Sequence, residues 1–456
     1  MRSAFAAVWV AVLCAGTMRA QEKSAPSVDR AARMEQVVSA YTKDNGFIGS
    51  VLVVDGDTVL LNKGYGDAVE EWNIANAPDV KFRLGSLTKQ FTASLVLLLE
   101  QDGKLRIEDP VNKYLPDVPA AWEKITLANL LGHTSGIPNF TNEKDFGEWA
   151  ANRHTHAEEL ARIEAKPLEF EPGSKFEYSN SNFEVLGMVI EKVSGEPYDK
   201  LLRERLLDPL GMSDTGLDTD DLVLPKRAEG YRRAGGGKLV VARSESMSIP
   251  WAAGSMYSTT GDLLKWERGL FGGKVLSADS LKRMTTPGKG DYGLGVFVQT
   301  KNGVRTVVHG GGIEGFNTEL AYVPERRLAV IVLSNENGGA IDRVSDELMS
   351  VALGKPVVLP DEHKPVPIAM EALKKFEGVY DVAPSFAITI AMGPNGLLAS
   401  GAGQQDLPLM YQGVVDGHAR FYARQPDAEL EFVPDANGTI TSLVLHQNGD
   451  HTAKKR

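Results

Sequence analysis

The sequence predicts an α+β protein: an antiparallel sheet flanked by helices, a mostly helical subdomain, and a small all-β domain at the C-terminus. Three observations support this fold class. Strand-like segments occur near both ends of residues 21–355, and the stretch from about 107 to 240 has a mostly helical pattern. Residues 356–367 contain four prolines, as a linker does. Residues 368–456 then show only short strand patterns separated by turn residues.

The first domain begins with the patterns of a helix, a hairpin and a second, strongly apolar helix. Apolar residues at helical spacing run from Val28 to Asp44. Asp55-Gly56 separates strand-like residues 49–54 from 58–61, which is typical of a hairpin with a primed turn. The run from Phe91 to Leu99 is apolar on nearly every side, so we expect a buried core helix there.

The rest of this domain alternates between helical and strand patterns. The clearest helix in the middle of the chain covers Phe183 to Val193 and stops before Gly195, and Thr259 caps another. We expect four later strands to complete one sheet with the early hairpin, at 294–298, 304–308, 319–323 and 328–333. A helix from Ile341 to Leu353 closes the domain.

Residues 1–20 have the layout of a secretory signal peptide. Arg2 precedes an apolar stretch from Ala4 to Ala15, and small residues lead to a cleavage position after Ala20. A membrane anchor is the weaker interpretation, because the apolar run is shorter than the roughly 20 residues that span a bilayer. We therefore expect a secreted or periplasmic protein with no transmembrane segment after cleavage. Cys14, the only cysteine, leaves with the leader, which excludes disulfides, a thiol nucleophile and thiolate metal sites.

The formal net charge of −11 argues against nucleic acid or an anionic membrane surface as a partner. The partner we expect is therefore a small-molecule or peptide substrate. The sequence does not determine the oligomeric state. We expect no metal site at His154-Thr155-His156, for want of a third histidine or a partnering carboxylate. No organic cofactor is implied either.

Ser86-Leu87-Thr88-Lys89 stands just before the apolar helix. A lysine three residues after a serine on a helix lies on the same face, one turn away, so the two side chains could touch. A serine hydroxyl needs a neighbouring base to become a nucleophile, and burial lowers the pKa of a lysine enough for that task. A helix cap at Ser86 and a solvent-reaching Lys89 are the purely structural alternatives.

Two further motifs follow in order. Tyr178-Ser179-Asn180 offers a phenol that can relay a proton and an amide that can hold a substrate carbonyl or orient Lys89. His309-Gly310-Gly311 ends an apolar strand with glycines, which let a substrate backbone approach the strand edge. Packing roles for Tyr178 and His309 are the alternatives, and we interpret His133 as a structural turn residue.

Together, Ser-x-x-Lys, Tyr-x-Asn and His-x-Gly resemble the motifs of the penicillin-recognising serine hydrolases: class C β-lactamases, D-alanyl-D-alanine carboxypeptidases, D-aminopeptidases and related esterases. Residues 131–138 and 170–173 also look like that family, and the tail resembles the lipocalin-like domain often appended to it. The resemblance implies a serine β-lactamase-like fold, catalytic Ser86, Lys89 and Tyr178, and an oxyanion hole made by the backbone N–H groups of Ser86 and Gly312. It implies substrate binding by Asn180, His309, Gly310, Gly311 and Gly312.

The third motif departs from that of β-lactamases, which carry Lys-Thr-Gly where this chain has His309, Gly310 and Gly311. Histidine is mostly neutral at pH 7 and glycine has no hydroxyl, so a carboxylate on the substrate loses a charged partner. We therefore expect a secreted serine hydrolase that acts through an acyl-enzyme on a D-amino-acid peptide or a small ester. A true β-lactamase, a D-alanyl-D-alanine carboxypeptidase and an inactive binding protein of the family are the alternatives.

Overall fold

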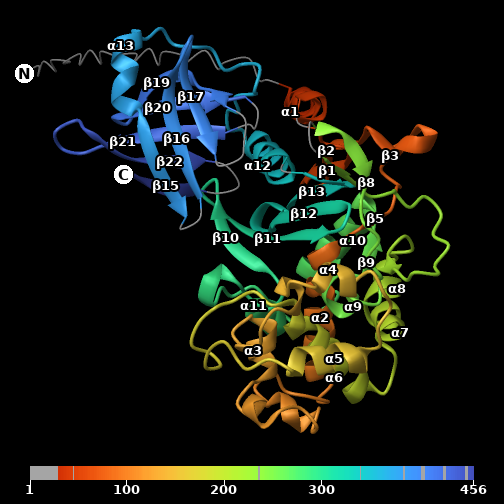
Figure 1. Cartoon of the computed structure of the whole chain (residues 1–456). Helices are drawn as coiled ribbons and strands as arrows, with labels where there is room; N and C mark the ends of the chain where they lie inside the picture. The colour runs from red at the N-terminus through yellow and green to blue at the C-terminus, as the bar shows by residue number, and fades with distance from the viewer. Residues whose placement is uncertain are drawn as a thin grey trace, which may run out of the picture.

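The α+β fold is observed in the computed structural model, which describes residues 29–44, 46–234, 237–338, 340–383, 386–401, 406–424, 428–446 and 450–456. The expected leader at residues 1–20 lies outside these ranges. Within them, no helix has the length and apolar character that crossing a membrane requires. Figure 1 shows the two parts of the chain, a larger one with sheet and helices and a smaller one built of strands.

A six-stranded antiparallel sheet is the centre of the larger part. The strand order is β10-β11-β12-β13-β1-β2. The bounds of these strands are β1 Gly49–Asp55, β2 Thr58–Tyr65, β10 Phe297–Lys301, β11 Val304–Ile313, β12 Phe316–Val323 and β13 Leu328–Ser334. The predicted joining of the early hairpin to the later strands is confirmed by the pairing of β1 with β13, in which Val51 lies opposite Val332. Gly56 has a φ of 61° in the turn between β1 and β2, as a primed turn with glycine first requires.

Four of the predicted strands differ from the observed ones by three or more residues. β2 continues to Tyr65, beyond the expected end at 61, and β12 begins at Phe316, before the expected start at 319. β10 begins at Phe297, three residues later than expected, and β11 continues to Ile313 through the glycine run. The extension of β11 follows from its partner, since the ladder with β12 continues from His309 opposite Leu320 to Gly312 opposite Asn317. Pairing with a neighbouring strand thus outweighs the low strand propensity of glycine.

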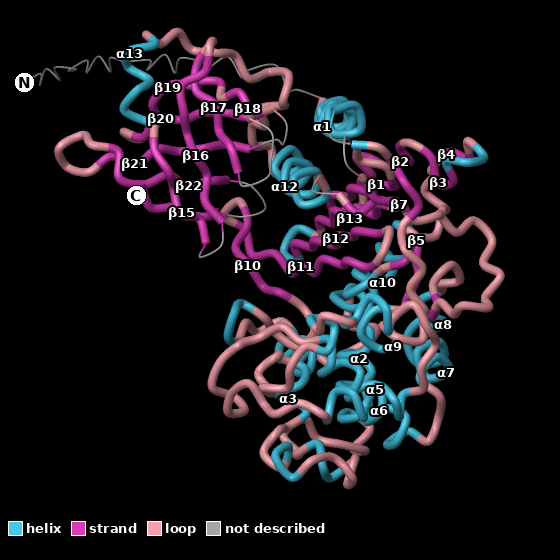
Figure 2. Tube along the Cα trace, in the orientation of Figure 1, coloured by secondary structure: helices cyan, strands magenta, loops and turns pink. Residues whose placement is uncertain are grey.

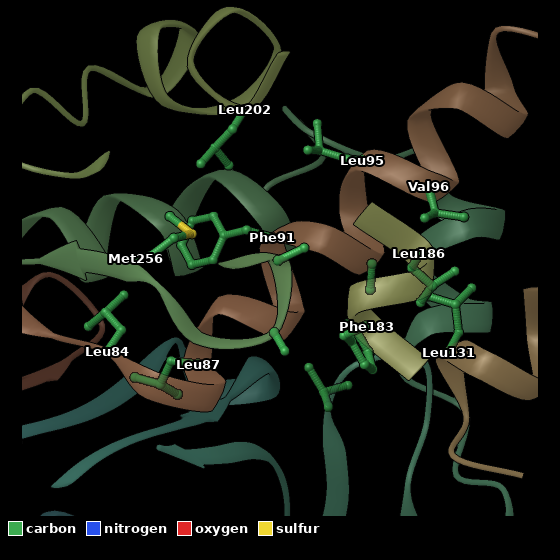
Figure 3. Packing of buried hydrophobic residues seen from close by; sticks show 14 of the residues in the cluster. Leu84, Leu87, Phe91, Leu95, Val96, Leu131, Phe183, Leu186, Leu202 and Met256 are labelled. Atoms are coloured by element: carbon green, nitrogen blue, oxygen red, sulfur yellow. The ribbon is translucent and has the colours of Figure 1, made fainter. Parts of the chain in front are cut away.

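Helices cover both faces of this sheet (Figure 2). On one face, α1 Arg30–Asp44 and α12 Ile341–Ala352 pack together over one buried cluster. On the other, α2 Thr88–Gln101 and α10 Thr260–Phe271 lie within a second, larger cluster. Phe91 of α2 stacks on Trp266 of α10 with ring centroids 4.0 Å apart. Figure 3 shows Phe91 among Leu84, Leu87 and Met256. The predicted core helix is therefore buried as expected.

The middle of the chain is less helical than its pattern predicts. α6 Asn180–Ser194 is its one long helix in the described residues, and it ends at Gly195 with a φ of 74°. A π-helical segment, Arg203–Leu207, joins α7 directly to α8, and longer connections separate most of the other short helices. The bounds of the remaining helices are α3 Leu127–Leu131, α4 Phe146–Trp149, α5 His156–Glu164, α7 Tyr198–Leu202, α8 Asp208–Leu210, α9 Trp251–Gly254 and α11 Ala278–Met284. Tertiary packing against α2 and α6, not local periodicity, positions these connections.

Short strands join the sheet to the helical region. Their bounds are β3 Asp67–Val69, β4 Ile74–Ala75, β5 Phe82–Arg83, β6 Gly216–Leu217, β7 Tyr231–Arg233, β8 Leu239–Val241, β9 Met256–Ser258 and β14 Glu336–Asn337. The strand β9 lies between β5 and β6. Because β5 immediately precedes the Ser86 turn, this small sheet anchors the N-terminal side of that turn.

The smaller part is all-β, as expected. Its nine strands form one antiparallel sheet in the order β18-β17-β16-β15-β23-β22-β21-β20-β19 around a separate buried cluster, with the short helix α13 Met370–Leu373 beside it. The strand bounds are β15 Gly378–Ala383, β16 Phe386–Gly393, β17 Gly396–Gly401, β18 Leu407–Pro408, β19 Met410–Val415, β20 His418–Ala423, β21 Ala428–Pro434, β22 Ile440–His446 and β23 Asp450–Lys455. Residues 353–369 contain no helix or strand. The exact domain boundaries stay predictions.

Candidate active site

Ser86 lies in a 3₁₀ turn, Gly85–Leu87, that leads directly into α2. Gly85 has a φ of 55°, and a Cβ atom on it would lie 2.9 Å from the backbone nitrogen of Gly312 in β11. The Thr318 hydroxyl of β12 donates to the carbonyl oxygen of Leu84 at 2.7 Å. The turn is therefore held against the sheet, which brings Ser86 beside the glycine run.

Lys89 points back to Ser86 from the first turn of α2. Its Nζ lies 3.0 Å from the Ser86 Oγ, 2.8 Å from the Asn180 Oδ1 and 2.8 Å from the carbonyl oxygen of Ala253. The side chain is 0% exposed. Burial lowers the pKa of Lys89 to about 7, against a smaller opposing effect of the Glu184 carboxylate.

This geometry suits a neutral lysine that acts as a base. A neutral amine carries two hydrogens, and the Asn180 and Ala253 oxygens can accept both of them. The lone pair then lies toward the Ser86 hydroxyl, from which it can take a proton. The expected contact between Ser86 and Lys89 is therefore present. The lowered pKa of Lys89 makes available the neutral amine that a nucleophilic serine needs as its base.

Tyr178 and Asn180 approach the same lysine from the start of α6. Lys89 Nζ lies 5.1 Å from the centre of the Tyr178 ring. Burial raises the pKa of the Tyr178 phenol, while a hydrogen bond with Ser86 acts in the opposite direction. The Asn180 side chain donates to the Thr141 hydroxyl at 3.1 Å while its oxygen receives Lys89. Three predicted catalytic residues and Asn180 are thus brought together.

His133 holds the Tyr178 segment in place. It has a φ of 54°, as a tight turn requires, and its side chain is fully buried. Its ring lies 4.2 Å from the Tyr178 ring, and its Nδ1 accepts the backbone N–H of Ser179 at 3.2 Å. Burial lowers the pKa of His133 well below its ordinary value, so it stays neutral. The turn role expected from the sequence is accompanied by a packing contact with Tyr178 that the sequence did not indicate.

His309 lies behind the site, within the sheet. Its Nδ1 is 2.6 Å from the carbonyl oxygen of Gly310, which makes Nδ1 the protonated nitrogen, and Nε2 then accepts the Tyr292 hydroxyl at 2.9 Å. Burial and the nearby Lys89 lower the pKa of His309 to about 3. His309 is therefore neutral, and it does not line the cavity described below. Its predicted contact with substrate stays a prediction.

The glycine run passes close to the serine turn. A Cβ atom on Gly311 would lie 2.0 Å from the carbonyl oxygen of Leu84, whereas Gly310 has ordinary room. Gly312 lines the cavity together with Ser86. These positions agree with the expected pairing of the Ser86 and Gly312 backbone N–H groups in an oxyanion hole, which stays a prediction.

A cavity of about 270 Å³ opens at Ser86. Three carboxylic side chains lie on its wall, Glu184, Glu245 and Glu314, and no lysine or arginine lines it in the described part of the chain. Burial raises the pKa of Glu245 to about 7. The sequence interpretation missed all three. Only Glu184 had a local signal, since it lies one helical turn after Asn180 on the same face of α6.

A second missed feature lies at His156, where the expected absence of a metal site stays a prediction. Glu159 follows it by three residues on α5 and supplies the carboxylate that the sequence analysis found wanting. With Glu184 of α6, these residues place one nitrogen and two carboxylate oxygens within 4.8 Å of one another. His154 instead stacks on Trp149.

Comparisons with known proteins agree with the fold and the motifs. The beta-lactamase family model matches residues 34–353. The chain is 32% identical over 335 residues to PbpX of Bacillus subtilis, which is named as a penicillin-binding protein, covering 73% of this chain and 81% of the relative.

Two solved structures extend this picture. The octameric penicillin-binding protein homologue of Pyrococcus abyssi covers 93% of this chain and 99% of its own, with a TM-score of 0.67 at 24% identity, a likeness of fold. The D-amino acid amidase of Ochrobactrum anthropi covers 72% of this chain and 98% of its own, with a TM-score of 0.63 at 26% identity. The resemblance inferred from the three motifs is confirmed, and the chain belongs to the beta-lactamase family of penicillin-recognising serine hydrolases.

Proposed function

We propose that this protein is a serine hydrolase that forms an acyl-enzyme on Ser86 and cleaves amides or esters, preferring D-amino-acid amides with a free ammonium group. One observation carries the proposal: the Ser86 hydroxyl lies 3.0 Å from a fully buried lysine whose pKa is about 7. A buried amine that is half neutral near pH 7 is matched to proton abstraction at that pH.

The reaction follows from the positions of the side chains. The Ser86 Oγ attacks the substrate carbonyl as Lys89 takes the hydroxyl proton. The backbone N–H groups of Ser86 and Gly312 hold the oxyanion that forms. Tyr178 gives its proton to the leaving nitrogen or oxygen and takes up the proton held by Lys89, the carbon–nitrogen or carbon–oxygen bond breaks, and the acyl group stays on Ser86. A water then attacks the acyl carbon as Lys89 takes one of its protons. That proton passes to the Ser86 oxygen as its bond to the acyl carbon breaks, and the acid leaves.

The charge of the cavity supports the substrate preference. Its wall carries Glu184, Glu245 and Glu314, while His309 is neutral. A substrate carboxylate would face Glu245 and Glu314, whereas an ammonium group would pair with their ionised forms. Glu184 is fully buried and adds no such charge. The amidase neighbour from Ochrobactrum anthropi acts on D-amino acid amides by its name, which agrees with this preference.

A panel of substrates tests the preference. We expect kcat/KM to be highest for D-alanine p-nitroanilide or p-nitrophenyl butyrate and slow or negligible for nitrocefin, with L-alanine p-nitroanilide as the stereochemical control. Replacing both acids, Glu245→Gln with Glu314→Gln, should raise KM for the ammonium substrate by about 10-fold or more and leave the neutral ester unchanged, because a charge-assisted bond is lost. Nitrocefin giving the highest kcat/KM by a wide margin would identify a true β-lactamase.

Covalent trapping tests the nucleophile separately. A fluorophosphonate should add its phosphonyl mass to the peptide that contains Ser86, and Ser86→Ala should abolish the labelling. Labelling that persists in Ser86→Ala assigns the nucleophile elsewhere. Absent labelling and turnover in a folded wild-type protein would instead favour an inactive binding protein of the family.

We also propose that the protein is exported, on the basis of the leader pattern at residues 1–20. Expressed with its own leader in a Gram-negative host, the mature chain should begin at Gln21. Intact mass and N-terminal sequencing of the periplasmic fraction check this, and an uncleaved chain in the cytoplasm contradicts it.

A further inference from the structure

A cluster of three potential ligands lies beside the cavity, between α5 and α6. His156 and Glu159 are three residues apart on α5, so they share a face of that helix. Glu184 faces them from α6. The His156 Nδ1 is 3.7 Å from a Glu159 oxygen, and one ligand atom from each residue lies within 4.8 Å of the others.

The polar atoms of this cluster lack partners. Glu159 is 0% exposed, yet neither of its carboxylate oxygens has a hydrogen-bond donor among the described residues. The same holds, over that part of the chain, for the Glu184 Oε2 and the His156 Nδ1. Two carboxylates buried side by side are unfavourable, because burial removes the water that would stabilise their charge. Here one backbone N–H, from Ala253, reaches Glu184, and the His156 ring lies 3.7 Å from Glu159. Such a set points to a missing positive charge.

Two of the three side chains are also held in place. The His156 ring stacks on Trp251 with centroids 3.6 Å apart. The Glu184 Oε1 accepts the backbone N–H of Ala253 at 3.3 Å, which leaves its Oε2 for the cluster. The His156 side chain is 39% exposed, so solvent can reach the cluster at His156, whereas Glu184 is fully buried beside the cavity. This is a pre-organised set of donors with an entry path.

We propose that His156, Glu159 and Glu184 bind one divalent transition-metal ion, with Zn²⁺ as the probe. An imidazole nitrogen with two carboxylate oxygens suits zinc and similar ions, which take three protein ligands and leave a further position for water. Calcium and magnesium prefer all-oxygen sites, so the nitrogen ligand disfavours them. Bonds of about 2.0–2.2 Å at tetrahedral angles place ligand atoms roughly 3.3–3.6 Å apart. Ligand atoms that lie up to 4.8 Å apart here therefore have to close by as much as about 1.5 Å, through rotation of the side chains.

Such an ion would join α5 to α6 at the wall of the cavity. The link to the reacting groups is short, since Ala253 donates its N–H to Glu184 and accepts the Lys89 amine at its carbonyl oxygen. The ion touches none of the reacting atoms, so its role is to position this wall. The proposal does not depend on the proposed hydrolysis.

Isothermal titration of Zn²⁺ into the full-length, EDTA-treated protein tests the site, and the Ser86→Ala variant should behave identically. We expect one ion per chain. Glu159→Gln should weaken binding by at least about 100-fold, and so should His156→Phe, which keeps the stack on Trp251 and removes the nitrogen. Co²⁺ in place of Zn²⁺ should give visible absorption bands that both variants lose. Circular dichroism establishes whether each variant is folded. If Glu159→Gln does not fold, the zinc affinity of His156→Phe alone tests the site.

A matched control lies in the small domain, where His446 and His418 flank Glu431 at 3.5 and 2.5 Å. Arg420 already pairs with Glu431 at 3.0 Å, so His446→Gln should leave the zinc affinity unchanged. Loss of binding in His446→Gln alone would overturn the proposal. So would wild-type affinity in a folded His156→Phe. Absence of binding to the wild-type protein would also overturn it, and would mean that Glu159 and Glu184 share a proton instead.

Discussion

The burial that makes Lys89 a base at neutral pH also destabilises the folded protein. Lowering the pKa of Lys89 from 10.5 to about 7 corresponds to roughly 5 kcal/mol of disfavoured charge, an upper figure for a fully buried amine. The unfolded chain holds that proton up to about pH 10, so the destabilising effect is full below pH 7 and fades as the pH rises from 7 toward 10. The three acceptors of Lys89 offset part of the cost when it is charged.

The charge state of Lys89 predicts the pH dependence of the reaction. Because the neutral amine is the active form, kcat/KM for a neutral ester should rise tenfold per pH unit below about pH 7 and level off above it. The pKa of Glu245 also lies at about 7, so Glu245→Gln is the control and should keep the same rising limb. A profile that is flat from pH 5 to 9 contradicts the role given to Lys89, and loss of the limb in the control assigns it to Glu245.

Replacing Tyr178 by Phe separates chemistry from packing. The ring and its contact with His133 remain while the hydroxyl near Ser86 is removed. We expect kcat to fall by about 100-fold or more, the usual scale for losing a proton-transfer group. Tyr198→Phe removes another buried hydroxyl, one that bonds Thr92 at 2.7 Å, and should leave kcat unchanged. Equal rates for Tyr178→Phe and wild type would leave Tyr178 with a packing role only.

At the scale of elements, the decisive contact is between β11 and the serine turn. The turn can approach the strand because Gly85 and Gly311 lack side chains where the two backbones meet. The register of β11 with β12 then places Gly312 at the edge of the cavity. A helix and a strand that are far apart in sequence thereby share one site.

A pair of glycine variants tests this contact. Gly311→Ala places a Cβ atom 2.0 Å from the Leu84 carbonyl oxygen and should destabilise the larger domain by about 1–3 kcal/mol or more. Gly310→Ala meets nothing closer than 3.6 Å and is the matched control. Five of the six tryptophans lie between residues 72 and 266, and Trp9 lies in the expected leader, so urea denaturation followed by tryptophan fluorescence reports on the larger domain. Equal unfolding free energies for the two variants would contradict the close approach.

At the scale of the whole molecule, the chain builds separate buried cores. The cluster of the nine-stranded part draws only on residues from Leu373 onward, whereas the site is built entirely within the larger part. Arg343 donates to the carbonyl oxygen of His446 at 3.2 Å, one of the contacts between the two parts. The small part therefore has a buried core of its own, and the candidate site lies outside it.

Deleting residues 368–456 should leave the catalytic constants within about twofold of the full-length protein, because no residue of that segment lines the cavity among the described residues. Kinetics on the preferred substrate of both proteins check this, with Trp fluorescence to establish that the shortened protein is folded. A folded but inactive truncation would show that the tail takes part in the reaction, and loss of ligand binding with intact activity would give the tail a binding role of its own.

The sequence by itself determined the features that depend on neighbours along the chain. The spacing of Ser86 and Lys89, the hairpin at Gly56 and the end of α6 at Gly195 all follow from a few adjacent residues and their backbone preferences. The alternating and helical patterns likewise predicted the antiparallel sheet and the all-β tail.

Only the tertiary structure decided the environment of those residues. Burial among segments that are distant in sequence, such as Ala253, which is 164 residues away, lowers the pKa of Lys89 to about 7. His309 is neutral because the sheet buries it. The acidic wall of the cavity and the His156 cluster draw their members from α5, α6 and distant loops. Burial and convergence depend on how the whole chain packs, since desolvation and Coulomb interactions act through space and leave no local pattern in the sequence.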